Sequence, residues 1–145
     1  VEATRHVIDQ LFAGRTVIVA TRQAEAADAL DYPLLILQHG TIVERGFISE
    51  VALKLACPQV VDVWMEGVRY DVLRQLKAQA GVMEARLLPS NDFMGQRLRL
   101  TVRSGRYLPL VYDVVSRHPL IRIDEHPVLL RSVLTRMSKQ AYSRK

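Results

Sequence analysis

The spacing of apolar residues changes twice within the first forty positions of the chain. Helical spacing comes first, at four residues that would share one face: Thr4, Val7, Ile8 and Leu11. Gly14 follows, where the end of a helix favours a left-handed backbone. Residues 16–20 then form an apolar, largely β-branched run without polar alternation, which is typical of a strand buried on both faces of a parallel sheet. The pattern therefore predicts a helix followed by a buried strand.

The following residues repeat this alternation. The predicted elements are a helix at 24–30, a second buried strand at 33–37, a turn at His39-Gly40 and a strand at 41–44. Alternating helices and strands favour an α/β sheet, in which ligands lie beyond the carboxyl ends of the strands. Thr21, Arg22 and Gln23 directly follow the first predicted strand. These three are the candidate binding residues of this segment.

The second part of the chain has a different order, because two strands now follow one another. Its predicted elements are helices at 47–56, 68–80 and 107–116, strands at 60–66, 83–88, 96–104 and 120–124, and a final helix opened by Pro127. The clearest strand is 96–104, in which Leu98 and Leu100 alternate with Arg97 and Arg99. The order β-α-β-β-α-β predicts a ferredoxin-like split unit. The expected fold class is therefore α/β in the first part and α+β in the second.

Composition narrows the class of protein. The chain has 145 residues, of which 49% are hydrophobic, enough for one ordinary domain or two small ones. Cys57 is the single cysteine, so neither an internal disulfide nor a zinc site built from thiols is possible, and a reducing compartment such as the cytosol is expected. No apolar run approaches the roughly 20 residues that span a bilayer. The positive net charge lies entirely after residue 46, which indicates two segments of different character.

The order and the residues of the first segment resemble a known family. The run G-R-T-V-I-V-A-T-R-Q-A-E-A, with D-Y-P-L-L-I-L-Q-H-G-T-I-V-E-R-G after it, is similar to the closing third of the nucleotide-binding domain of ABC transporter ATPases. The resemblance covers residues 1–46 without a gap. It implies that this chain is a piece of a longer polypeptide, whose intact form uses ATP and Mg. It also implies a second nucleotide-binding subunit or domain, a transmembrane permease, and a cytoplasmic location, peripheral on the inner face of the plasma membrane.

The resemblance gives Arg22 an unusual place. Thr21 aligns with a family threonine, and Arg22 stands where the switch histidine is expected. A neutral imidazole accepts a hydrogen bond from attacking water, whereas a guanidinium is a permanent cation that only donates. The resemblance therefore implies that Thr21, Arg22 and Gln23 sense the γ-phosphate in the intact protein, with Arg22 at the catalytic switch position of a degenerate, slow or non-hydrolysing site. The alternative is a plain arginine at the end of a strand, in solvent.

Other parts of the family pattern are missing from this chain. It contains no G-x-x-x-x-G-K-[ST] phosphate loop and no Ser-Gly-Gly signature. A phosphate loop cradles phosphates through a row of backbone N–H groups, so without one the chain alone is not expected to hold ATP or another cofactor. Whether this is an enzyme is left open, since ATPase activity would belong to the intact subunit.

The second segment is similar, in element order, to the small C-terminal domain of ATPases of the drug, antibiotic, sodium and gliding-type exporters, and its final helix reads P-V-L-L-R-S-V-L-T-R-M-S. The domains implied are 1–46, the C-terminal part of the ABC nucleotide-binding domain; 47–59, a linker helix; and 60–145, a ferredoxin-like accessory domain with a C-terminal helix. Such an accessory domain implies regulation or the pairing of subunits. The basic residues of 131–145 either contact anionic lipid or a membrane partner, or form a solvated face.

A basic unit with this topology also suggests RNA binding, which needs aromatic residues on the central strands. Strand 96–104 contains none, and Trp64 is the only aromatic residue expected on that face. Three arginines are instead expected to face acidic residues across the sheet: Arg97, Arg99 and Arg103 against Asp62, Glu66 and Glu84. The sequence predicts a self-neutralised surface and no nucleic-acid partner.

The alternative function is a stand-alone ferredoxin-like module that senses a ligand or binds a protein, without nucleotide chemistry. Ferredoxin-like sheets pair edge to edge and bind ligands at the seam, although no residue here marks a pocket. An enzyme with its own site is disfavoured, because no histidine has a paired carboxylate or nucleophile at a recognisable spacing. Plain loop or surface roles are expected for all four histidines: His6, His39, His118 and His126. No metal site is expected.

Overall fold

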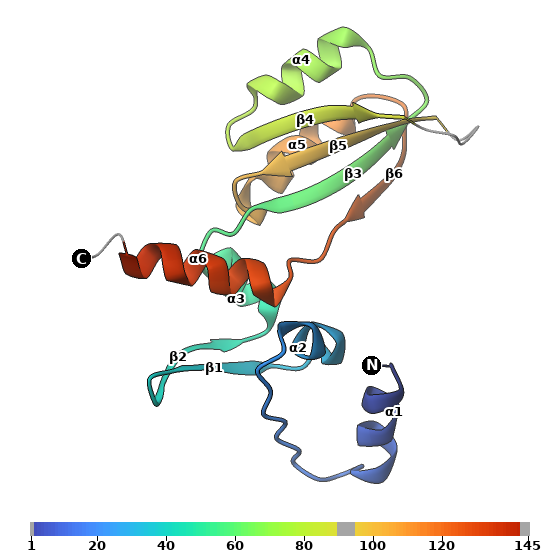
Figure 1. Cartoon of the computed structure of the whole chain (residues 1–145). Helices are drawn as coiled ribbons and strands as arrows, with labels where there is room; N and C mark the ends of the chain where they lie inside the picture. The colour runs from blue at the N-terminus through green and yellow to red at the C-terminus, as the bar shows by residue number, and fades with distance from the viewer. Residues whose placement is uncertain (1, 90–94, 143–145) are drawn as a thin grey trace. The chain divides into compact units, whose positions relative to one another are not determined.

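Figure 1 shows the computed structural model of the chain, which describes residues 2–89 and 95–142. The described residues form a mixed α+β structure with six α-helices, one 3₁₀ turn and six strands in two antiparallel sheets. The chain divides into two compact units, Val1–Leu55 with Leu129–Lys145, and Ala56–Val128. No helix in the described ranges is long and apolar enough to cross a bilayer.

The first unit is a set of helices around one β-hairpin. Its elements are α1 (Glu2–Leu11), α2 (Ala24–Leu30), β1 (Leu34–Gln38), β2 (Thr41–Gly46), α3 (Ile48–Lys54) and α6 (Leu130–Tyr142). Strands β1 and β2 pair antiparallel through the predicted turn, where His39 and Gly40 both have positive φ. The helices at α1, α2 and α3 and the hairpin were all predicted by the sequence pattern.

Residues 16–20 correct a central prediction. They were expected to form a strand buried on both faces, but they form no strand, and Ile18 is 88% exposed. Figure 1 shows them as part of the coil between α1 and α2. A fully buried strand needs neighbours that take up its backbone hydrogen bonds and cover its side chains. In the described part of this unit the two strands pair with each other, so the predicted parallel sheet is absent and Thr21 and Arg22 follow a coil instead of a strand.

The hairpin carries a related correction. The strand predicted at 33–37 is present as β1, but it is not buried, because Leu35 is 57% and Leu37 is 64% exposed. The apolar character of the hairpin is thus visible on its surface. In a two-stranded ribbon the faces are covered only by what packs on them, so burial depends on other elements and not on the strand's own composition.

Helix α6 belongs to the first unit by its contacts. It lies against α2 and α3, and Val133 is fully buried. The Arg136 guanidinium donates to the carbonyl oxygen of Leu55 (3.2 Å), just beyond the end of α3. The sequence predicted this helix within an accessory domain of residues 60–145. In the structure, the compact unit that contains most of that range ends at Val128.

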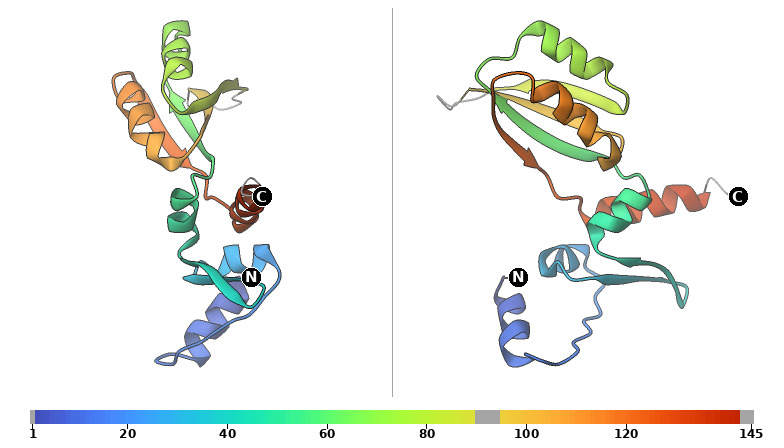
Figure 2. Two further views of the ribbon diagram at one scale, coloured as in Figure 1. Left: turned by 90° about the vertical axis from the view of Figure 1, so that its left-hand side faces the viewer. Right: turned by 180° about the vertical axis from the view of Figure 1, so that it is seen from behind.

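The second unit is a four-stranded antiparallel sheet with helices on one face (Figure 2). Its elements are β3 (Gln59–Met65), α4 (Tyr70–Ala78), β4 (Val82–Leu88), β5 (Gln96–Val102), a 3₁₀ turn (Gly105–Tyr107), α5 (Leu108–Val115) and β6 (Leu120–Glu125). The strand order is β4-β5-β3-β6. Strand β5 lies between β3 and β4 and is antiparallel to both.

The core of this unit combines residues at strand spacing with residues at helical spacing. Alternate residues of the strands face the helices, and residues at helical spacing face the strands. The fully buried members are Val61, Val63, Met65, Val72, Leu76, Leu98, Leu100, Val102, Val111 and Val115. Gly81 ends the connection from α4 with φ +83, and a Cβ there would overlap the ring of Tyr107. Only glycine satisfies both the backbone and the space at this position.

Candidate functional site

The candidate binding residues Thr21, Arg22 and Gln23 lie together immediately before α2. All three are exposed. The hydroxyl oxygen of Thr21 accepts a hydrogen bond from the backbone N–H of Gln23 (3.0 Å), which shapes the turn into the helix. Within the residues that the structure describes, Arg22 makes no ion pair. The segment therefore offers a solvent-facing guanidinium beside a hydroxyl, a pair suited to an anion.

Two acidic side chains of α2 contact α6. The Asp28 carboxylate accepts a hydrogen bond from the backbone N–H of Leu130 (2.7 Å) at the start of α6, and Glu25 forms an ion pair with Arg131. The first four N–H groups of a helix lack partners within it, so Asp28 caps α6 from another element. A displacement of α2 would therefore move the N-terminus of α6.

The second unit carries a concentrated charge cluster on the sheet face opposite its helices. Asp62 lies on β3, and its side chain is only 1% exposed. Arg99 holds both carboxylate oxygens, with Nε to Oδ1 at 2.8 Å and Nη2 to Oδ2 at 2.8 Å. Arg97 Nε donates to Oδ2 (3.2 Å), and His126 Nε2 lies 2.8 Å from the same oxygen. Three side chains from β5 and the end of β6 thus converge on one carboxylate.

The surroundings of Asp62 set its protonation state. Burial alone would raise the pKa of this carboxyl, but the hydrogen bonds from Arg99, Arg97 and His126 outweigh burial and hold its pKa well below the ordinary value. The same contact raises the pKa of Arg99. Asp62 is therefore a carboxylate with its oxygens already engaged and ionised at neutral pH, which suits a structural anchor and not a general base.

Trp64 lies beside this cluster and is covered by guanidinium groups. The Arg122 guanidinium carbon lies 4.1 Å and that of Arg97 lies 5.0 Å from the centre of its ring, and Trp64 is 8% exposed. Arg122 also pairs with Asp124 at 2.7 Å. Cation–π stacking of this kind occupies the ring face that a nucleic-acid base would need.

The predicted arginine row is partly as expected. Arg97 and Arg99 face Asp62, as the alternation of β5 indicated. Glu84 instead pairs with Arg86 of its own strand, and the described residues contain no ion pair between Arg103 and Glu66 or Glu84.

His126 was missed, because it was assigned a plain loop role. One signal could have identified it: Arg122, Asp124 and His126 continue the alternation of one face of β6. The backbone N–H of His126 in fact extends the ladder by donating to the Val60 carbonyl (2.9 Å).

The other candidate residues show no concentrated chemistry. His39 lies in the hairpin turn with φ 50. No group of three or more His, Cys, Asp or Glu side chains in the described ranges could hold a metal ion. The chain thus offers two distinct surfaces, an exposed Thr-Arg-Gln segment in the first unit and a charge-neutralised sheet face in the second.

Two sequence comparisons, with protein family models and with curated proteins, add no relative to this picture. No protein family model matches the chain, and no curated protein sequence matches it significantly. The likeness of residues 1–46 to ABC transporter ATPases therefore stays a prediction based on the residues alone, and the geometry of the two surfaces carries the functional argument.

Proposed function

We propose that this chain is the C-terminal part of the ATP-binding subunit of an ABC exporter, which couples ATP binding and hydrolysis to transport across a membrane. The observation that carries the proposal is the exposed apolar run at 16–20, which ends in the polar residues Thr21, Arg22 and Gln23. Exposed β-branched residues in such a run are stable in water only at a cost, which neighbouring strands of a larger sheet would remove. The family domain contains such strands.

The chemistry of the Thr21–Gln23 segment fits one part of this role. Arg22 has the charge and the donors to hold a γ-phosphate oxygen, and Thr21 keeps its hydroxyl proton available, because its oxygen is the acceptor for Gln23. The described residues offer no ligand set for Mg, so the metal and the rest of the phosphate cradle belong to other parts of the intact subunit. ATP supplies the charged phosphate to which this segment would respond.

The contacts of α2 suggest how a response to phosphate at residues 21–23 would reach α6. Arg22 lies two residues before α2, and Asp28 and Glu25 of α2 hold the N-terminus of α6. A shift of α2 on phosphate contact would displace the N-terminus of α6, so this C-terminal helix would respond to the nucleotide state. The partners in this scheme are a second nucleotide-binding subunit and a transmembrane permease, with the subunit peripheral on the cytoplasmic face of the plasma membrane.

The second unit is proposed to be a ferredoxin-like accessory domain. Its element order β-α-β-β-α-β, its antiparallel strand order β4-β5-β3-β6 and the placement of both helices on one face support this assignment. The neutralised face around Asp62 and the covered ring of Trp64 favour a role in regulation or subunit pairing over nucleic-acid binding.

The test uses the product of the complete open reading frame that encodes this chain. It should contain a phosphate loop and bind ATP in equilibrium dialysis, and Arg22→His should raise phosphate release about tenfold or more, because an imidazole can accept from the attacking water. His39→Ala is the matched control and should leave turnover unchanged. A product with no phosphate loop that binds no ATP overturns the proposal, and an unchanged rate for Arg22→His removes the degenerate-switch role.

The second candidate is a stand-alone ferredoxin-like module that senses a ligand or binds a protein. Its support is that the second unit has a complete core of its own, with buried or half-buried residues from all four strands and both helices. This alternative predicts that the unit at 56–128 keeps its fold and its binding behaviour when residues 21–23 are replaced by alanine.

A further inference from the structure

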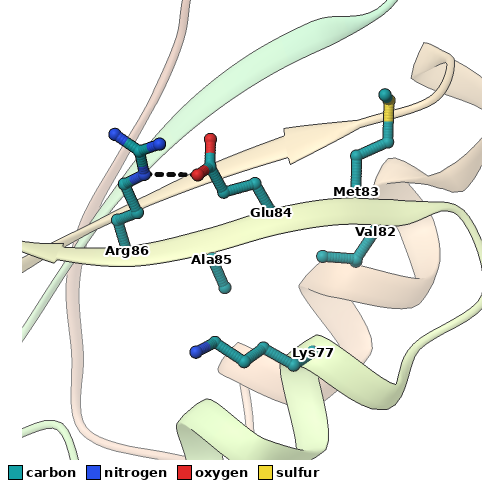
Figure 3. Close-up of a pocket in the computed structure, with 6 residues that line it drawn as sticks. All are labelled: Lys77, Val82, Met83, Glu84, Ala85 and Arg86. Carbon is teal, nitrogen blue, oxygen red and sulfur yellow. Dashed lines mark hydrogen bonds and ion pairs between the residues drawn. The ribbon is translucent and has the colours of Figure 1, made fainter.

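Strand β4 has an open edge. It forms one side of the four-stranded sheet, pairs with β5 on its inner side, and has no strand partner on its outer side among residues 2–89 and 95–142. Figure 3 shows an open groove along this strand, lined by Lys77 of α4 and by five consecutive residues of β4, from Val82 to Arg86. An edge strand exposes alternate backbone N–H and C=O groups, so it is a template for another strand.

The sequence of β4, V-M-E-A-R-L-L, is complementary to itself when one copy is reversed about Ala85. In an antiparallel pair centred there, Glu84 of one copy lies opposite Arg86 of the other, and this happens twice by symmetry. Residues directly opposite on one face of such a pair are close enough to interact. The centre of the strand therefore has a matched charge pattern.

The flanks of the strand match as well. Apolar residues stand on both sides of the central three, Val82 and Met83 before them and Leu87 and Leu88 after them, so each apolar end meets the other apolar end. Met83 is 60% and Leu87 is 47% exposed. The pairing of β4 with β5 is irregular between Val82 and Glu84, so the regular part of a symmetric pair about Ala85 is residues 84–86, and the apolar residues lie on either side of it.

The charged side chains at the centre of the strand are exposed to a partner. Glu84 and Arg86 point away from the helix-covered face in Figure 3 and contact each other, with 46% and 68% of their side chains exposed. Their contact joins residues two apart on one strand, and a second copy would offer each of them an opposite charge on the facing strand. Complementarity across a strand pair sets register and partner choice.

We propose that β4 pairs antiparallel with β4 of a second copy of this chain, forming a two-fold symmetric dimer in which the two four-stranded sheets become one continuous sheet. A two-fold interface requires one patch to be complementary to itself, and the pattern around Ala85 meets that requirement. This deepens the proposed role of the second unit as an accessory pairing domain and rests on that role, but it does not depend on nucleotide chemistry in the first unit.

The opposite edge, β6, fits a second copy less well. An antiparallel pair centred on Ile123 would set Arg122 opposite Asp124, but it would also set Ile121 against Glu125, an apolar residue against a charge. Glu125 is also occupied within its own unit, by Gln59 at 3.0 Å and by Tyr112. The β4 edge is therefore the one whose central charges and apolar flanking residues both match across the symmetry axis.

A charge-swap experiment on the full chain tests the pairing. Glu84→Arg places arginines opposite each other in the dimer, and Arg86→Glu places glutamates opposite each other, so each variant alone should weaken dimerisation about tenfold or more in sedimentation velocity. Mixing the two variants should restore a dimer near wild-type affinity, because each like-charged strand then faces one of opposite charge. Within each variant the 84–86 contact stays repulsive, so restoration reports only the contact between chains.

The control uses a second exposed ion pair of the same unit, Asp113 with Arg117 on and beside α5. Asp113→Arg and Arg117→Asp should leave the dimer affinity unchanged, and circular dichroism should show that all variants fold. A wild-type chain that remains monomeric at 100 μM or above (about the Kd of a weak pair), or a mixture that fails to form heterodimers in native mass spectrometry, overturns the proposal. ATP binding by the complete gene product would be unaffected by either result, so the two proposals fail separately.

Discussion

The two units of this protein differ in how they handle apolar residues. The second unit buries a cluster of thirteen hydrophobic residues between its sheet and its helices. Among the described residues, most of the large apolar side chains that remain exposed belong to the first unit, including Leu11, Val17, Ile18, Val19, Leu35, Leu37 and Ile42. The second unit can therefore hold its own fold, whereas the first unit displays surface that a larger sheet would cover.

The largest expected effect comes from making a leucine-to-alanine substitution in each unit and comparing the losses of stability. Leu100→Ala removes a fully buried side chain from the core of the second unit and should lower the free energy of unfolding by about 3 to 4 kcal/mol. Leu35→Ala, on the exposed hairpin, should change stability by no more than about 0.5 kcal/mol. Urea unfolding followed by Trp64 fluorescence reports the first value, and hydrogen exchange of the hairpin amides reports the second. Equal losses would show that the first unit has a core of its own.

The sequence predicted the second unit well because its signals are local. Strands β3, β4, β5 and β6 and helices α4 and α5 follow from apolar spacing of two or of three to four residues, and Arg97 and Arg99 face Asp62 as alternation required. Boundaries moved by a residue or two where turns and the 3₁₀ segment took over. His126 was missed because it lies just beyond the end of β6, where it was expected to be a loop residue, although the alternation of β6 continues through it.

The first unit shows why an apolar run does not by itself make a strand. Residues 16–20 have strand propensity and a buried-strand composition, yet β structure requires a neighbour to satisfy its backbone groups. Helix α2 formed where it was predicted, at 24–30, because helical hydrogen bonds lie within the segment. The same distinction explains why Thr21, Arg22 and Gln23 are found next to a predicted helix but not at the end of a predicted strand.

The charge cluster gives the next largest expected effect. Asp62→Asn removes the charge that two arginines share, and should cost about 2 to 3 kcal/mol of unfolding free energy at pH 7, since Asp62 is buried. Asp113→Asn, in an exposed ion pair, is the control and should cost under about 0.5 kcal/mol. Comparable losses for both variants would mean that the cluster adds nothing beyond an ordinary surface pair.

The stability that the Asp62 cluster contributes should depend on pH. The pKa of Asp62 is lower in the folded chain than its ordinary value of 3.8, so the stability that it contributes is fully present above about pH 4 to 5. Below that range the unfolded chain takes up the proton first, and the free energy of unfolding of the wild type should fall as the pH decreases. The difference in the free energy of unfolding between wild type and Asp62→Asn should therefore shrink between about pH 5 and about pH 2, a range around the ordinary carboxyl pKa. Urea unfolding at each pH measures this difference. A difference in unfolding free energy that does not change with pH would contradict the stabilising role of the ionised Asp62 carboxylate.

A smaller effect is expected where the two ends of the first unit meet. Asp28→Ala removes the cap on the N-terminus of α6 and should lower the protection of the first α6 amides by about 1 kcal/mol in hydrogen exchange. Glu25→Gln removes only the exposed pair with Arg131 and should cost under about 0.5 kcal/mol. If Asp28→Ala left α6 unchanged while Glu25→Gln loosened it, the connection from α2 to α6 would be electrostatic and not a helix cap.

The smallest expected effect is also the sharpest test of the contrast between the units. Ile18→Asn in this chain should change the free energy of unfolding by less than about 0.5 kcal/mol, because the side chain is 88% exposed. If the proposed exporter assignment is right, neighbouring strands cover residues 16–20 in the complete gene product. The same substitution would then place an amide inside a sheet, where an unsatisfied polar group costs about 1 to 3 kcal/mol. Thermal melting of both proteins, with Leu35→Ala as a second reporter, separates the two situations. An Ile18→Asn variant that is equally harmless in both would mean that the run at 16–20 is a surface segment wherever it occurs, and the exporter assignment would lose the observation on which it depends.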